Sequence, residues 1–262
     1  MFSSRVIRLP KNTDKDWEYY GAVAPYFGVL SDERFSPANL SEAALEDFFS
    51  SGVEHIEEVF DVIEKNIEPG FTPARSLDFG CGVGRIVLPL ARRSGHVVGV
   101  DVSPGMLKEA RLNSEKYGIS NVEFVESDET LSKVSGTFDF VHSYIVMQHI
   151  SPRRGVRFLA RLLELLKPGG VGALHFTYSW QGWLQQASRG ARFVRWLRES
   201  VPGGQGLMNL ARGRRFDHPN MLMNTYDVNR LFSMLQEHGC REVHVKFTDH
   251  NGHWGVMLVF QK

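Results

Sequence analysis

Three glycines at alternate positions, 80, 82 and 84, mark the stretch of the chain best suited to hold a ligand. They follow Leu77, Asp78 and Phe79, whose pattern predicts the end of a buried strand, and a helix is expected to begin beyond them. Glycine can adopt positive φ and lets a ligand approach without an intervening Cβ. A strand, a glycine turn and a helix N-terminus together present backbone N–H groups to a ligand. Arg85 occupies the position of the third glycine of the dinucleotide fingerprint, so a nicotinamide-dependent enzyme is not favoured.

A second candidate ligand group stands at the end of the next predicted strand, residues 96–100. Asp101 lies 21 residues after Gly80, where a carboxylate can accept hydrogen bonds from both hydroxyls of a ribose. Such charge-assisted bonds contribute about 1.5–3 kcal/mol each. Capping of a helix in solvent is the other role that this position allows.

The elements that must position these residues alternate between strand and helix. Strands are expected at 74–79, 96–100, 122–125, 138–143 and 172–177, and helices at 85–93, 104–117 and 152–166. This alternation predicts an α/β fold with a doubly wound, parallel sheet. A further helix, 226–238, precedes two strands, 242–248 and 254–261, whose five-residue link is short enough for an antiparallel hairpin.

The segment from Asp78 to Gly84 resembles motif I of the class I S-adenosylmethionine-dependent methyltransferases. Residues 124–128, 138–144 and 166–170 resemble later motifs of that family in the same order, so the likeness covers about residues 74–178 and the terminal hairpin. It implies a mostly parallel, seven-stranded sheet that ends in an antiparallel hairpin. It also implies S-adenosylmethionine as the cofactor, and no clustered cysteines or acids predict a metal ion.

The resemblance further implies which residues surround the cofactor. Val102 would pack on the adenine, Asp128, in preference to Glu129, would receive its amino group, and the end of residues 138–144 would lie beside the methionine part. The predicted cofactor-binding residues are Asp78, Gly80, Cys81, Gly82, Gly84, Arg85, Asp101, Val102, Met106, Ser127, Asp128, Glu129, Ser143 and Tyr144.

The acceptor side of the site is less defined. His149 follows the fourth strand, where ligands of such sheets bind, and its ordinary pKa suits a general base. Packing against the next helix is its alternative role. His142 is expected in the core, and the pair His250 and His253 is read as a loop rather than a metal site. The predicted substrate-binding residues are Tyr20, Tyr26, Gln148, Trp180 and Trp183.

Two segments flank this predicted core. Residues 1–70 are expected to form an aromatic and helical N-terminal cap, with a helix at 41–67, that either clamps the main domain or helps to cover the ligand. Residues 71–262 would form the methyltransferase core. Within it, residues 179–225 read as an inserted lid or substrate wall; their tryptophans and arginines also suit an anionic or lipid contact, or a dimer contact.

Composition narrows the functional classes. Lys and Arg together number 30, as do Asp and Glu, which argues against a nucleic-acid partner or stable membrane insertion. Two cysteines, Cys81 and Cys240, indicate a reducing, cytoplasmic setting. The resemblance therefore predicts a methyltransferase for a small-molecule acceptor, at oxygen rather than nitrogen or carbon, and allows a homodimer. The alternatives are a protein, lipid-linked or RNA acceptor, or a module that binds the cofactor without turnover.

Overall fold

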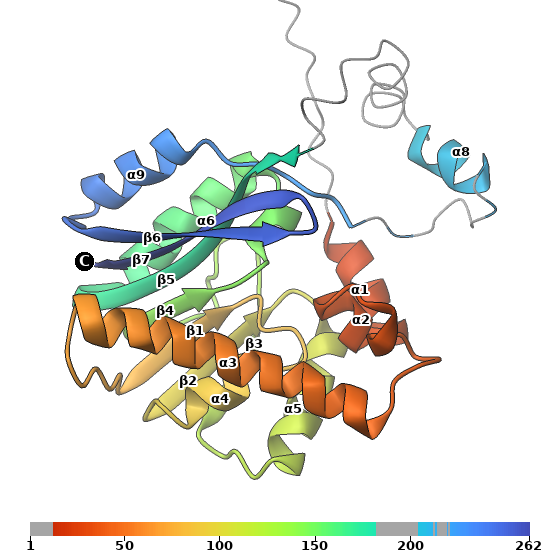
Figure 1. The fold of residues 1–262 in the computed structure, drawn as a ribbon, viewed down its shortest axis with the longest axis horizontal. Coiled ribbons are helices and arrows are strands. Elements are labelled where there is room, and N and C mark those ends of the chain that lie inside the picture. Colours follow the sequence, from red (N-terminus) through yellow and green to blue (C-terminus); the bar gives the residue numbers. More distant parts are fainter. Residues whose placement is uncertain (1–12, 182–203, 212, 214–218, 220) are drawn as a thin grey trace, which may run out of the picture.

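A seven-stranded sheet with the order β3-β2-β1-β4-β5-β7-β6 forms the centre of the protein in the computed structural model (Figure 1). The structure describes residues 13–181, 204–211, 213, 219 and 221–262. The strands are β1 (Arg75–Phe79), β2 (His96–Asp101), β3 (Val122–Glu126), β4 (Phe138–Ser143), β5 (Leu166–Trp180), β6 (Val243–His250) and β7 (His253–Gln261).

The first five strands are parallel, and the last two are antiparallel to their neighbours. This confirms the predicted mostly parallel sheet with a terminal antiparallel hairpin. Parallel strands place all their carboxyl ends at one edge, so the glycine loop after β1 and Asp101 at the end of β2 become neighbours.

Helices cover both faces of the sheet, as the prediction of a doubly wound fold requires. Side chains of α3, α4 and α5 pack with the sheet on one face, and those of α6 and α9 pack on the other (Figure 1). The helical elements are α1 (Asp14–Val23), α2 (Pro25–Val29), η1 (Glu33–Phe35), α3 (Glu42–Asn66), α4 (Val87–Ala91), α5 (Pro104–Lys116), η2 (Met147–His149), α6 (Pro152–Leu165), α8 (Gly204–Ala211) and α9 (Val228–Glu237).

Helix α3 lies against the back of the glycine loop. The Ser41 side chain caps it by accepting the Ala44 N–H at 3.2 Å, and the helix continues through Gly52. A Cβ at Gly52 would stand 2.1 Å from the Arg85 carbonyl oxygen, so only glycine permits this approach. The helix predicted at 41–67 is confirmed, and it shares a hydrophobic cluster with the sheet. The division of the chain at residue 70 stays a prediction.

Several predicted boundaries were wrong. Helix α4 begins two residues late because Gly84 holds a left-handed φ of 90°. Strand β5 begins at Leu166, which pairs with Phe138, so residues 166–170 are not only a turn. The link of the final hairpin is two residues, Asn251 and Gly252, and not five as predicted. Their φ values of 55° and 83° are both positive, which is the backbone geometry that a two-residue hairpin turn requires.

Within the described residues, none of the helices combines the length and apolar character that crossing a bilayer demands. Much of the predicted lid, including Trp183, lies outside the described residues.

Candidate active site

A pocket opens at the carboxyl edge of the sheet, between the glycine loop, the N-terminal helices and η2. It contains about 780 Å³ of empty space, a volume that includes solvent at its open mouth. It is lined by Thr13, Asp14, Trp17, Gly28, Val29, Phe79, Gly80, Gly82, Val100, Asp101, Val102, Met106, Ser127, Tyr144, Ile145, Val146, His149, Ile150, Arg154 and Phe158.

The glycine loop has the geometry expected from its sequence. Its glycines at 80, 82 and 84 have φ values of 78°, 52° and 90°, which side chains strongly disfavour. A Cβ at Gly80 would lie 2.3 Å from a Val146 methyl carbon, and one at Gly82 would lie 2.6 Å from a Val29 methyl carbon. The loop therefore needs glycine for both its backbone shape and its packing. Gly84 packs on Ala110 and does not line the pocket.

Asp101 faces the same pocket from the end of β2. Its carboxylate accepts the N–H groups of Gly82 and Ser103, each at 2.9 Å, so it also holds the glycine loop in place. Burial raises the pKa of Asp101 to about 6, although the two N–H donors oppose that rise. Each carboxylate oxygen keeps further acceptor capacity for a ligand hydroxyl.

Only some of the residues predicted to surround the adenine lie at the pocket. Val102, Met106 and Ser127 line the pocket, whereas Asp128 and Glu129 do not. The Asp128 carboxylate accepts hydrogen bonds from Thr130 and Ser132. These donors hold the pKa of Asp128 well below the usual range, and the Ser132 hydroxyl has the largest effect.

Glu129 makes ion pairs with Arg154 at 3.1 Å and with Arg157 at 3.5 Å. Asp128 is thus satisfied within its own loop and Glu129 by two arginines of α6, an outcome that adjacent sequence positions do not reveal.

Asp78 lies beneath the glycine loop and outside the pocket lining. Its Oδ1 accepts from His142 Nδ1 at 2.8 Å, and His142 Nε2 lies 2.9 Å from His55 Nε2. The predicted core position of His142 is confirmed by its complete burial. His55 was not among the residues predicted from the sequence, because nothing in the spacing of α3 shows that one of its turns faces β4.

Three other predicted cofactor residues are buried near the pocket without lining it. Cys81 is a free thiol whose pKa burial raises. The Ser143 hydroxyl donates to the Phe79 carbonyl oxygen at 2.9 Å. Arg85 is 5% exposed, donates to the Ser51 hydroxyl at 3.3 Å, and its Nε has no hydrogen-bond partner within the described part of the chain. Tyr144 does line the pocket.

His149 lines the opposite wall. Its Nδ1 lies 2.9 Å from the Leu222 carbonyl oxygen, so this nitrogen carries the proton and donates. Its Nε2 is then the acceptor and lies 3.2 Å from Nε2 of Gln148, whose Oε1 accepts from the Thr177 hydroxyl. Burial lowers the pKa of His149 to about 4, so the ring is neutral near pH 7.

The turn that carries His149 is fixed by residues far along the chain. The Tyr226 hydroxyl contacts the carbonyl oxygens of Met147 and Ile150, each at 2.9 Å. The Asn224 N–H donates to the Gln148 carbonyl oxygen at 2.6 Å. Residues 224–226, at the end of the predicted insertion, therefore close over η2.

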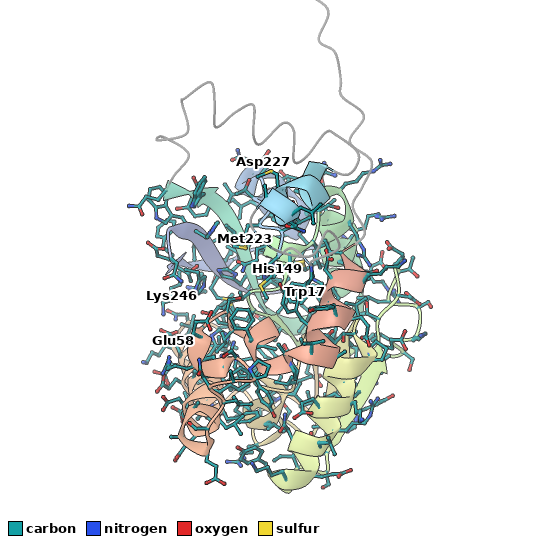
Figure 2. All side chains as sticks on the ribbon, turned by 90° about the vertical axis from the view of Figure 1, so that its right-hand side faces the viewer. Trp17, Glu58, His149, Met223, Asp227 and Lys246 are labelled. Atoms are coloured by element: carbon teal, nitrogen blue, oxygen red, sulfur yellow. The ribbon has the colours of Figure 1, made fainter. Side chains whose placement is uncertain are left out.

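Helix α1 forms a roof over the pocket. The Trp17 ring meets the His149 ring edge-on at 4.8 Å, and Figure 2 shows the two side chains together beside α1. Arg154 of α6 binds both carboxylate oxygens of Asp14, at 2.6 and 3.0 Å. This geometry supports the alternative in which the N-terminal segment helps to cover the ligand.

The predicted substrate residues do not come together. Tyr26 is buried, and its hydroxyl contacts Glu109 at 2.8 Å and Asn113 at 3.0 Å, so it fastens α2 to α5. Tyr20 packs in the same N-terminal cluster, Gln148 lies behind His149, and Trp180 stacks on His253. None of these four lines the pocket, and their substrate role stays a prediction.

Several pocket residues were absent from the sequence-based set. Trp17 stood in the aromatic stretch that the sequence highlighted, but Arg154, Phe158 and Ile145 carried no local signal. Ile145 has a φ of 61°, a strained value for a β-branched residue, and it lies beside Tyr144 in the pocket wall. Strain of this kind concentrates at ligand sites.

Comparison with known proteins agrees with this geometry. Residues 77–170 match the family described as a methyltransferase domain. A ubiquinone biosynthesis O-methyltransferase of Dinoroseobacter shibae is 37% identical over 101 residues, which are 38% of this chain and 40% of that protein. The protein of the same name from Ruegeria sp. (strain TM1040) is 30% identical over 138 residues, 53% of each. The aligned part of this chain thus spans two fifths to about half of these relatives.

Two solved structures share the whole fold. Magnesium protoporphyrin IX methyltransferase from Synechocystis PCC 6803, solved with SAH, superposes with a TM-score of 0.62 at 17% identity, covering 96% of this chain and 100% of that one. The N-methyltransferase NodS from Bradyrhizobium japonicum WM9, also with SAH, gives 0.57 at 13% identity, covering 96% and 99%. This chain therefore has the same fold as these two methyltransferases, and its residues 77–170 match a methyltransferase domain.

Proposed function

We propose that this protein is an S-adenosylmethionine-dependent methyltransferase that acts on a small-molecule acceptor. When bound, S-adenosylmethionine supplies a sulfonium methyl group for transfer. The observation that carries the proposal is the pocket in which the glycine loop and Asp101 meet beneath α1.

The residues present fit that cofactor. Gly80 and Gly82 line the pocket, and side chains at these positions would displace Val146 and Val29 of the pocket wall. Asp101 has acceptor capacity for ribose hydroxyls. The Nε of the buried Arg85 has no hydrogen-bond partner in the described chain, and its guanidinium lies over the ring of Tyr144, which lines the pocket.

For the acceptor atom we propose oxygen. The support is that relatives named O-methyltransferases align with this chain over two fifths to about half of their own length. His149 would accept the proton that the acceptor hydroxyl loses. Its Nε2 holds the lone pair because Leu222 fixes the proton on Nδ1, and the weak bond from Gln148 would yield to the acceptor. Trp17 and His149 together suit a planar, aromatic acceptor.

The test is calorimetric titration of S-adenosylmethionine and SAH into the wild-type protein and Asp101→Asn. We expect binding by the wild type and at least tenfold weaker binding by the variant, because the neutral amide loses the charge-assisted bonds to the ribose. A wild-type protein that binds neither compound contradicts the proposal.

Acceptors are then screened with labelled methyl groups, beginning with phenols. Methylation of proteins, lipid-linked compounds or RNA instead would overturn the small-molecule part. Binding without turnover of any acceptor would point to a non-catalytic module. A cytoplasmic location, a homodimer and the absence of a nucleic-acid partner stay predictions.

A further inference from the structure

A buried chain of polar side chains connects α3 to the pocket wall. It runs from Asp78 of β1 through His142 of β4 to His55 of α3, with nitrogen–oxygen and nitrogen–nitrogen separations of 2.8 and 2.9 Å. All three residues are at most 9% exposed. The proposed reaction uses neither histidine.

The direction of the hydrogen bond to Asp78 follows from the chemistry of the partners. A carboxylate only accepts, so His142 Nδ1–H donates to Asp78. The other ring nitrogen of His142, Nε2, lies 2.9 Å from His55 Nε2, and one of these two nitrogens donates to the other. Burial and the neighbouring His142 lower the pKa of His55, which keeps its ring neutral.

The other face of His55 touches the pocket wall. Its ring stacks on Tyr144 with centroids 3.8 Å apart and planes 20° apart. Tyr144 lines the pocket, and its backbone leads into the strained Ile145. One imidazole therefore orders two groups: Tyr144 by its ring face, and Asp78 by its edge through His142.

We propose that His55 is a positioning residue for the ligand pocket, and that its stacking on Tyr144 sets the shape of the wall that a bound cofactor meets. This inference rests on the proposed function. His55 lies on α3, outside the matched residues 77–170, and the proposal gives it a role in the pocket that those residues build.

Two substitutions separate the contacts of His55. His55→Phe keeps a ring for stacking and removes the hydrogen bond. His55→Gln keeps an N–H donor near the place of Nε2 and removes the ring. Both should lower the melting temperature, but only His55→Gln should weaken binding of SAH, by roughly three- to tenfold, the range that one aromatic contact provides. Glu54→Ala, an exposed neighbour on α3, should bind as the wild type does.

Each outcome decides between the proposals. If the wild type binds no SAH, the proposed function fails and this inference fails with it. If the wild type binds and His55→Gln binds equally well, only this inference is overturned. A double-mutant cycle with Tyr144→Leu keeps the test valid if a His55 variant folds poorly. Tyr144→Leu alone should raise the dissociation constant of SAH about as much as His55→Gln does. The double variant should bind no more weakly than either single variant. Additive losses overturn the inference.

Discussion

Gly80 combines a left-handed backbone with a position that has no room for a side chain. Its φ is 78°, and a Cβ would meet Val146 at 2.3 Å. We expect Gly80→Ala to weaken SAH binding at least tenfold, because the added methyl group displaces the pocket wall in addition to straining the loop by about 1–3 kcal/mol.

Gly118→Ala is the matched control for that measurement. Gly118 has a φ of 67°, but nothing lies within 4 Å of its Cβ position. This variant should lose thermal stability through backbone strain and bind SAH normally in a calorimetric titration. Equal binding by both variants would show that the close approach of Val146 is irrelevant.

Asp101 should make ligand binding dependent on pH. Its folded pKa is about 6 because burial disfavours the carboxylate, and the ionised form is the better hydrogen-bond acceptor. The dissociation constant for SAH should therefore be constant above about pH 7 and rise as the pH falls through 6, by up to roughly tenfold per pH unit. Titration at several pH values checks this, and the dependence should be absent from Asp101→Asn.

Helix α1 is the element that closes the pocket, and one ion pair holds its first turn. Arg154 binds Asp14 with both terminal nitrogens, and the two side chains are largely buried. Asp14→Asn should weaken this fastening by about 1 kcal/mol and raise the dissociation constant of SAH about fivefold, chiefly through faster release.

The control for α1 is Arg153→Gln. Arg153 is the exposed neighbour of Arg154 on α6, so its loss leaves the roof unchanged. Stopped-flow release of SAH compares the variants. An unchanged release rate in Asp14→Asn would mean that α1 does not control exit from the pocket.

At the scale of the whole molecule, buried histidines set the response to acid. Burial lowers the pKa of His55, His149, His175 and His250. In the unfolded chain these histidines bind protons near pH 6.5, whereas in the folded protein they stay neutral at that pH. Their contribution to the free energy of unfolding is therefore complete above pH 6.5 and is lost as the pH falls. Asp101 acts in the opposite direction between about pH 4 and 6, as a single carboxylate against these several histidines of the described chain.

The melting temperature should therefore fall steadily from pH 7 to pH 5. His175, with no exposed surface and a pKa near 3, contributes at most about 1.4 kcal/mol per pH unit. His175→Gln should flatten the dependence, whereas His96→Gln, on a more exposed strand end, should not. Calorimetric melts across this range test the expectation; parallel curves for wild type and His175→Gln would contradict it.

Much of this protein could be read from its sequence because the relevant signals are local. Glycine spacing determines where the backbone takes positive φ, Ser41 shows where α3 begins, and alternating strands and helices predict a doubly wound sheet. The parallel order then brings the residues after β1 and β2 to one edge, so Gly80, Gly82 and Asp101 were found together in the pocket.

The tertiary structure alone decided which side chains complete that pocket. In the sequence, Asp128 and Asp101 are both acids that follow strands. In the structure, the Asp128 carboxylate accepts hydrogen bonds from its own loop, whereas Asp101 faces the pocket. Trp17 reaches the pocket from α1, and His55 supports its wall from α3, both far in sequence from the strand ends that build the site. Side-chain direction across an interface depends on how helices pack on the sheet, and that packing depends on the whole core, which no short stretch of sequence encodes.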